Sequence, residues 1–502
     1  MEAGLGIRDT HVEDILVKEN SFLSLETENA AIPEYSTAQK LLPCPFWNGR
    51  DYVIQCYWKA WELAFGNLRR PAAESRFITN FIDTAFNGCL FMWDSAFILM
   101  FGRYGSRVFN FQKTLDNLYA RQHKDGYICR QLRESDGLEV FERLDPASTG
   151  PNIMPWCEWE YYLNTGDRER LEKVFPVLLA YTNWFRKYRS WPDGTYFSCG
   201  WGCGMDNQPR VPADYSCEFD HGHMSWIDTT CQQILANRML IRMALELGRE
   251  SYITHLKEEM TNLTDFVNQN MWNEKIKFYT DRFKNGTLSD LKSIGSFWAI
   301  MAEIAPTDRL EALISHLENP YEFKRPHRVP SLAADHPAYS PDGGYWLGAV
   351  WAPTNYMVLR GLTVAGKDEL AHEIGLNHLE NVVKAYMEQG TLFENYAPES
   401  AEGKCRTDFV GWTGLSPGAV LFEYVFGLRP DAGKKSLLWD VNLLDEHGIK
   451  RYPFGPDALI DLHCADRKKP TDEPVIQARS DYDIELVVKW PGGTKKIRTS
   501  VS

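Results

Sequence analysis

Two acidic side chains have the type and setting that hydrolytic chemistry needs. Asp206 follows a glycine-rich turn, and the segment 207–210 that follows it is rich in hydrogen-bond donors. Glu394 lies between Phe393 and Tyr396, whose rings could exclude water and raise its pKa. Glycoside hydrolysis requires one carboxylic acid to protonate the leaving oxygen and one carboxylate to activate water or attack the sugar. Taken alone, each residue is better explained by a structural role, as a turn cap or a surface side chain.

A third segment, 343–356, is rich in aromatic side chains. It carries Trp346 and Trp351 among glycines, and the whole chain has 17 Trp residues. Flat aromatic faces can stack on the apolar face of a sugar ring, so this segment could form a platform at the entrance of a helix. Core packing explains Trp351 and Tyr356 equally well.

These loops need a scaffold, and the apolar pattern predicts a helical one. The period is clearest over 168–188, where Pro176 is expected to kink or restart the helix. Short turns join several adjacent helices, which makes them antiparallel neighbours. The predicted helices cover 51–67, 92–104, 108–121, 151–164, 168–188, 225–247, 250–270, 293–303, 306–317, 348–363, 367–389 and 413–427.

Long loops separate the predicted helical pairs. They cover 122–150, 189–224, 318–347 and 390–412. Helical hairpins with their long loops on one rim predict a mainly α fold, a closed (α/α)6 toroid whose loops build the site. An open helical solenoid is the alternative, but it would show a sequence period, and we find none.

The chain changes character after Gly427, where short apolar or β-branched runs predict strands. We therefore expect a small C-terminal β appendage on the helical fold. The predicted organisation is an N-terminal arm at 1–50, a catalytic domain at 51–429 and a small β-rich domain at 430–502.

The net charge of the chain disfavours some classes of binding partner. The 502 residues carry a formal net charge of −14, which disfavours binding to nucleic acid and to anionic membranes. The N-terminus lacks the pattern of a secretory signal, so a cytoplasmic location is expected. Neither a cofactor nor a metal is predicted, because the usual phosphate, dinucleotide and zinc-protease motifs do not occur. The oligomeric state is not indicated.

The 11 cysteines are scattered and odd in number, which does not indicate a disulfide framework. Cys199 and Cys203, with Cys217 and His221 downstream, could form a zinc site. A structural role for these residues is the stronger interpretation, because no second closely spaced pair accompanies them.

Five segments together resemble the glycoside hydrolase family 63 and trehalase-like group, which includes mannosylglycerate and glucosylglycerate hydrolases. The matching segments are 92–97, 204–210, 345–356, 394–399 and 411–415. They occur in the family's order and span most of the helical region. The resemblance implies a toroid and an inverting, exo-acting hydrolysis of an α-linked glucoside or mannoside.

The resemblance also implies roles for individual residues. Asp206 is then the general acid and Glu394 the general base. The implied substrate-binding residues are Trp93, Asp94, Gln122, Arg210, Trp346, Trp351 and Trp412. Leu347 departs from the family, since many relatives carry Arg there. The Cys199/Cys203 pair and the segment 217–223 are not features of the group either, so the pocket and its substrate are expected to differ.

Two other functions are compatible with such a chain. A toroid-fold polysaccharide lyase or sugar epimerase would use a His or Tyr as acid and base. The loop candidates for that role are His123, His221, His223 and His336. A carbohydrate-binding or scaffold protein without catalysis is the third hypothesis, and the presence of both carboxylates argues against it.

Overall fold

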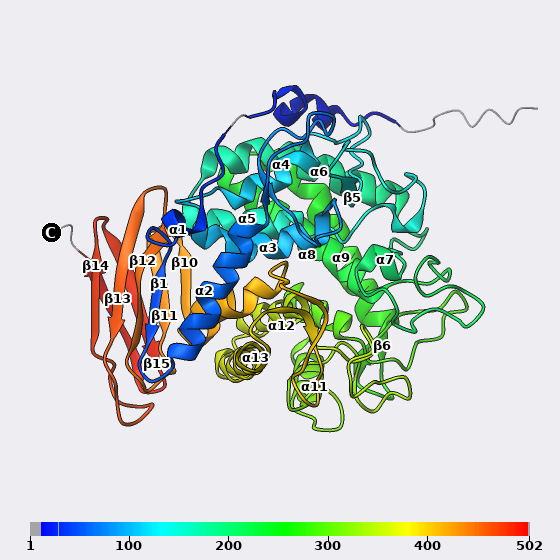
Figure 1. The fold of residues 1–502 in the computed structure, drawn as a ribbon. Coiled ribbons are helices and arrows are strands. Elements are labelled where there is room, and N and C mark those ends of the chain that lie inside the picture. Colours follow the sequence, from blue (N-terminus) through cyan, green and yellow to red (C-terminus); the bar gives the residue numbers. More distant parts are fainter. Residues whose placement is uncertain (1–11, 29, 500–502) are drawn as a thin grey trace, which may run out of the picture.

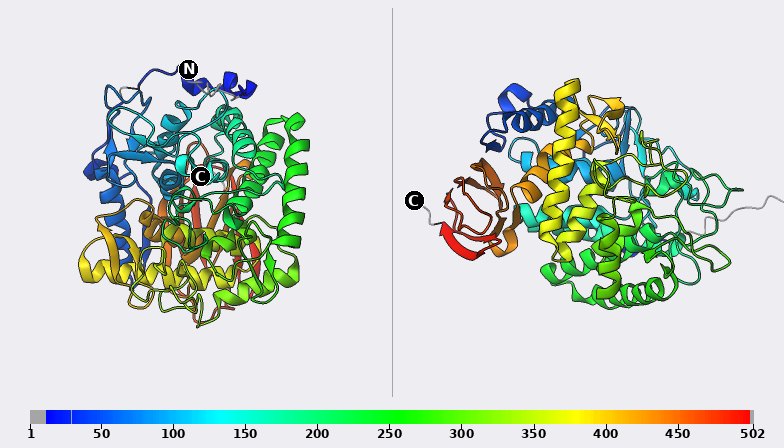
Figure 2. Two further views of the ribbon diagram at one scale, coloured as in Figure 1. Left: turned by 90° about the vertical axis from the view of Figure 1, so that its right-hand side faces the viewer. Right: turned by 90° about the horizontal axis from the view of Figure 1, so that it is seen from below.

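The computed structural model describes residues 12–28 and 30–499, and helices dominate it (Figure 1). The C-terminal strands lie together beside the helical region, next to α2 (Asp51–Gly66) (Figure 1). Figure 2 shows the same arrangement from two further directions. Within the described ranges, no helix is long and apolar enough to cross a membrane.

Within the described part of the chain, six helices are buried on most sides and form an inner layer. They are α3 (Met92–Gly102), α5 (Met154–Thr165), α8 (Ile227–Leu247), α10 (Trp298–Met301), α12 (Ala352–Val364) and the π-helix η9 (Ser416–Val425). A helix that is apolar all round must be enclosed by protein, and every residue of α3 is buried. Each inner helix contacts the next along the chain, and η9 contacts α3, so the contacts run in a closed cycle.

Other helices cover this layer from outside. Besides α2, they are α6 (Arg168–Tyr188), α9 (Ile253–Asn270), α11 (Thr307–Leu317) and α13 (Asp368–Gln389), with the short η4 (Phe111–Leu115) and α4 (Asp116–Tyr119) between α3 and α5. The longer of these helices are amphipathic, and α11 buries only Leu313, Ile314 and Leu317. Inner and outer helices therefore alternate along the chain. The inner helix α8 buries most of its residues, polar ones included, whereas the outer helices α9 and α11 bury one face.

Each predicted helix overlaps helical structure, and the range 168–188 matches α6 at both ends. The expected restart at Pro176 is wrong, since α6 runs through this residue, and the expected kink stays a prediction. Proline removes one backbone hydrogen bond, but Pro176 and its neighbours Phe175 and Val177 are buried, so tertiary packing keeps the helix continuous.

The C-terminal strands form two four-stranded sheets. One has the order β10-β11-β15-β16, from Leu428–Asp431, Ser436–Asp440, Ile484–Trp490 and Gly493–Thr499. The other has the order β1-β12-β13-β14, from Cys44–Trp47, His447–Phe454, Ala458–Cys464 and Ile476–Ser480. The strand β1 comes from the predicted N-terminal arm and pairs antiparallel with β12. The arm thus contributes a strand to a C-terminal sheet.

Candidate active site

Loops at one end of the inner helices enclose a pocket of about 290 Å³. Asp94 lies in the first turn of α3, Trp346 precedes α12, and Trp412 directly precedes the short helix η8 (Thr413–Leu415). The pocket thus lies at helix N-termini, whose partial positive charge favours anionic groups. The predicted residues that line it are Trp93, Asp94, Asp206, Trp346, Glu394 and Trp412.

Asp206 follows α7 (Gly200–Cys203), a short helix that ends at Gly204 with a left-handed φ of 77°. A Cβ at Gly204 would lie 3.2 Å from the ring of Trp93, so the glycine lets this ring sit beside the acid. Burial raises the pKa of Asp206 to about 6, although the positive charge of Arg130 opposes this shift. The side chain can therefore carry a proton at mildly acidic pH, as a general acid must.

Glu394 lies in a strand, β8 (Phe393–Tyr396), where a loop was predicted. This strand pairs with β9 (Gly403–Thr407). The Tyr345 hydroxyl donates to Oε1 at 3.3 Å, and the Arg406 backbone N–H donates to Oε2 at 3.4 Å. Burial raises the pKa of Glu394, and these two donors oppose the shift. A donor on each oxygen favours the carboxylate form, which a general base requires.

Asp94 is the third carboxyl group of the pocket. Burial raises its pKa to about 7, and the nearby charges of Glu394 and Asp206 act in the same direction. Like charges in a shared, poorly solvated site disfavour simultaneous ionisation. Asp94 is therefore largely protonated below neutral pH and can donate a hydrogen bond to a ligand.

Hydrogen bonds connect the loops that carry the acid and the base. The Asn207 amide donates to the Gly344 carbonyl at 3.0 Å and accepts from the Trp346 N–H at 2.9 Å. Tyr345, between these two residues, reaches Glu394. The loop of the acid, the aromatic turn and the strand of the base are thus one connected unit.

The aromatic turn is supported from behind by Trp351. The rings of Trp346 and Trp351 are parallel, with centroids 4.0 Å apart. Trp351 is fully buried and does not line the pocket, in contrast to its predicted contact with substrate. Its indole N–H donates to the Tyr345 carbonyl. Trp351 therefore holds the ring that faces the pocket.

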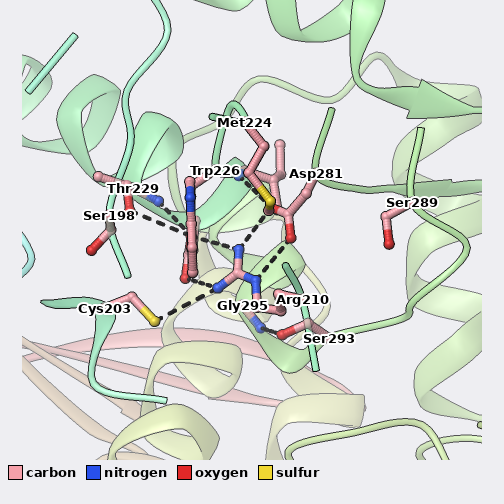
Figure 3. Close-up of polar contacts among 12 residues, drawn as sticks. Ser198, Cys203, Arg210, Met224, Trp226, Thr229, Asp281, Ser289, Ser293 and Gly295 are labelled. Atoms are coloured by element: carbon pink, nitrogen blue, oxygen red, sulfur yellow. Dashed lines mark hydrogen bonds and ion pairs between the residues drawn. The ribbon is translucent and has the colours of Figure 1, made fainter. Parts of the chain in front are cut away.

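Arg210 also lies outside the pocket lining, although the sequence predicted a substrate contact. Figure 3 shows its guanidinium enclosed by neighbouring side chains. It forms paired hydrogen bonds with Asp228 and with Asp281, at 2.6–2.8 Å, and lies over the Trp226 ring. The geometry differs from the prediction because two buried carboxylates compensate this buried cation. Arg210 ties the acid's loop to α8.

Gln122 is likewise remote from the pocket lining. Its amide donates to the carbonyls of Gly126 and Val177, and its oxygen accepts from Asn20. The side chain is buried, and these partners use the hydrogen-bonding groups of its amide. It joins the N-terminal arm to the helical region.

Several pocket residues were not predicted as substrate contacts. Among them are Arg130, Gln131, Trp201, Tyr345 and Arg406. Trp201 lies in the glycine-rich turn that precedes Asp206, and Tyr345 lies in the aromatic segment 343–356. Arg130 and Arg406 lie in segments that carry no sequence signal of their own, and only the fold brings them to the pocket.

The cysteines and histidines of the loops, which were candidates for a zinc site or for acid/base catalysis, lie in other environments. The Cys199 sulfur accepts from the Gly202 N–H and caps α7. Throughout the described ranges, no cluster of His, Cys, Asp and Glu is placed to hold a metal ion. None of the histidines proposed for a lyase or epimerase lines the pocket. His123, for example, is paired with Glu139.

Comparisons with known proteins place this site in context. Residues 89–413 match the family described as mannosylglycerate hydrolase MGH1-like glycoside hydrolase domain. A mannosylglycerate hydrolase from Thermus thermophilus is 25% identical over 399 residues, covering 66% of this chain and 92% of the relative. A probable mannosyl-oligosaccharide glucosidase from Schizosaccharomyces pombe is 25% identical over 421 residues, covering 75% of this chain. The match covers 47% of that glucosidase, so the chain spans about half of its length.

A solved structure is similar in fold. A GH63 mannosylglycerate hydrolase from Thermus thermophilus, in complex with glucose, superposes with a TM-score of 0.59 at 20% identity. The superposition covers 72% of this chain and 99% of that one.

Proposed function

The chain belongs to the mannosylglycerate hydrolase MGH1-like glycoside hydrolases, and we propose that it is an inverting, exo-acting α-glycosidase. The family resemblance predicted from the five sequence segments is confirmed, and the protein is a glycoside hydrolase. The proposed substrate has an α-linked glucosyl or mannosyl group at its non-reducing end. The observation that carries the proposal is the presence of Asp206 and Glu394 in one tryptophan-lined pocket.

In the proposed mechanism, Asp206 gives its proton to the glycosidic oxygen as the bond to the anomeric carbon breaks. Glu394 takes a proton from a water molecule, which attacks the anomeric carbon from the opposite face. The C–O bond to the leaving group is replaced by a C–O bond to water, and the anomeric configuration inverts. Protonated Asp94 can donate a hydrogen bond to a sugar hydroxyl, while the rings of Trp93, Trp346 and Trp412 can pack against the sugar.

The stereochemical outcome tests the mechanism. Product anomers followed by NMR in the first minutes of hydrolysis should be β from an α-linked substrate, and a first-formed α anomer contradicts inversion. The panel should contain α-glucosides, α-mannosides and glycosylglycerates. Asp206→Asn and Glu394→Gln should each lower kcat by at least about a thousandfold while largely preserving substrate binding.

The dependence of activity on the leaving group distinguishes the role of Asp206 from that of Asp94, which also has a raised pKa. A glycosyl fluoride needs little protonation of its leaving group, so Asp206→Asn should lose far less activity on the fluoride than on a glycosidic substrate. Asp94→Asn should instead weaken binding of both substrates alike. The opposite pattern would identify Asp94 as the general acid.

We further propose that the helical region is an (α/α)6 toroid. The closed cycle of contacts among the inner helices and the alternation of inner and outer helices support this architecture. The proposed division of the chain is an arm at 1–50, the catalytic domain at 51–429 and the β-rich domain at 430–502. The boundary at 429/430 falls within β10, and the one at 50/51 falls between β1 and α2, so limited proteolysis should cut first outside these paired elements. Early cuts within α12 or α13 would contradict the division.

We propose a cytoplasmic location and no nucleic-acid partner. All eleven cysteines are free in the structure, which fits a reducing compartment. The net charge of −14 opposes binding to phosphate backbones. Fractionation of cells that express the chain, followed by immunoblotting, tests the location, and recovery outside the cytosolic fraction contradicts it.

A further inference from the structure

A row of aromatic side chains leads away from the pocket on the side of Asp206. Trp201 lines the pocket, and the ring of Phe219 lies 4.7 Å from its ring. Phe141 lies 5.9 Å from Trp201 on an edge-to-face contact. Phe219 keeps 45% of its surface exposed, which is unusual for a phenylalanine. The row thus continues the pocket lining to the molecular surface.

Backbone hydrogen bonds hold the segment that carries Phe219 against the loop of the acid. The Gly200 N–H donates to the Cys217 carbonyl at 2.9 Å, and the Trp201 N–H donates to the Glu218 carbonyl at 3.0 Å. A Cβ at Gly200 would lie 2.5 Å from the Cys217 oxygen, so only glycine permits this approach. Phe219 therefore has a fixed place beside Trp201.

Polar groups flank this row. The Arg130 guanidinium lies over the Phe141 ring at 4.5 Å and 5.9 Å from the Trp201 ring, and its Nε donates to the Ala147 carbonyl. Among the described residues, its two terminal amino groups have no hydrogen-bond partner, and the residue lines the pocket. The charge of Glu218 acts on Asp206 from the same side. Donors and an acceptor thus surround an apolar surface.

Aromatic faces bordered by such polar groups suit a sugar ring, which has an apolar face and a rim of hydroxyls. The general acid protonates the leaving oxygen, so groups beyond it contact the leaving group. We propose that Trp201, Phe219 and Arg130 form a subsite that holds a sugar ring as leaving group. The substrate is then an α-linked disaccharide or the end of an oligosaccharide.

This inference rests on the proposed function. It differs from what the name mannosylglycerate hydrolase suggests and is in line with the name mannosyl-oligosaccharide glucosidase. A small anionic leaving group such as glycerate could reach Arg130, but it would be too short to cover Phe219 as well. The segment 217–223 was singled out in the sequence because the family does not share it. The structure gives this segment a place in substrate selection.

The test compares leaving groups of different size on the full chain. The probes are α-glucosyl and α-mannosyl fluorides, α-linked glucobioses and mannobioses, and the corresponding glycosylglycerates. The preferred disaccharide should have a higher kcat/KM than the glycosylglycerate. Phe219→Ala should lower the ratio of kcat/KM for the disaccharide to that for the fluoride by roughly two- to tenfold, which is the expected loss of one aromatic contact. Phe219→Trp should restore it.

Tyr321→Ala is the matched control, because Tyr321 is an exposed aromatic residue outside the pocket lining. It should leave the ratio within twofold. An unchanged ratio in Phe219→Ala, or a clear preference for the glycosylglycerate, overturns the subsite.

A binding measurement keeps the subsite testable if no substrate is turned over. In the Glu394→Gln background, calorimetric titration with the disaccharide should give a Kd that Phe219→Ala raises by roughly two- to tenfold. An unchanged Kd overturns the subsite. Failure of the wild-type chain to hydrolyse even the fluorides overturns the proposed function. In that case the calorimetric Kd of the disaccharide still tests the subsite.

Discussion

Asn207 accepts a hydrogen bond from the backbone N–H of Trp346, so the residue after the proposed general acid anchors the aromatic turn beside it. The same amide donates to Gly344, and Tyr345 between them reaches Glu394. The separation between acid and base is therefore fixed by side-chain hydrogen bonds as well as by the helices.

Substitution of Asn207 should misplace these groups without removing either one. Asn207→Ala should lower kcat by about 10- to 100-fold, because shifts near 1 Å in a catalytic site have effects of that size. Asn207→Asp keeps the acceptor for Trp346 but places a carboxylate oxygen opposite the Gly344 carbonyl oxygen, so kcat should fall in this variant as well. Steady-state kinetics with an activated and a poor substrate measure both variants. Wild-type kcat in Asn207→Ala contradicts a positioning role.

The two carboxyl groups should produce a bell-shaped pH profile of kcat/KM. Asp206 acts in its protonated form, so activity should fall as the pH rises through its pKa of about 6. Glu394 acts as a carboxylate, so activity should fall as the pH drops through its pKa, which burial raises above the usual value. The positive charge of Arg130 lowers the pKa of Asp206, so Arg130→Gln should move the alkaline limb to higher pH.

Glycosyl fluoride is the control for this profile, because its leaving group needs little protonation. The alkaline limb should weaken or disappear with the fluoride and persist with a disaccharide. An alkaline limb that is identical for both substrates would assign it to a group other than the acid.

Asp94 should make the folded protein less stable as the pH rises. Its pKa is about 7 in the fold against a usual value of 3.8, so its ionisation costs at most about 4 kcal/mol by linkage. The free energy of unfolding is highest below the pKa that Asp94 has in the unfolded chain. It declines as the pH rises toward the pKa that Asp94 has in the folded protein. Asp94→Asn removes this decline, so its Tm relative to wild type should increase from pH 4 to pH 8. A Tm difference that does not change with pH would contradict the raised pKa.

Arg210 should affect stability far more than substrate binding. Arg210→Met leaves Asp228 and Asp281 buried without their cation, at a cost of about 3–5 kcal/mol. Arg242→Met, at a half-exposed position, should change stability by less than about 0.5 kcal/mol. Chemical denaturation measures both. A raised KM in Arg210→Met with unchanged stability would restore the substrate contact predicted from the sequence.

The amino-acid pattern determined the positions of the helices. The helical period of the apolar residues marks the segments that form helices and the side that each one buries. The range of α6 was predicted at both ends for this reason. The C-terminal strands were predicted from their β-branched and apolar runs, but the contribution of β1 to their sheet was not, since no local pattern reveals a partner about 400 residues away.

The sequence also identified Asp206 and Glu394 as candidate catalytic residues, since their neighbours in the chain and the segments that resemble the family can be read without a structure. Tertiary structure decided which of their neighbours face the pocket. Arg210 follows Asp206 closely in the sequence and Trp351 follows Trp346, yet Arg210 is enclosed by carboxylates and Trp351 lies behind Trp346. Arg130 acts on the acid, and Phe219 packs on Trp201, only through folding, because contacts between separate segments depend on packing geometry that the order of residues does not display.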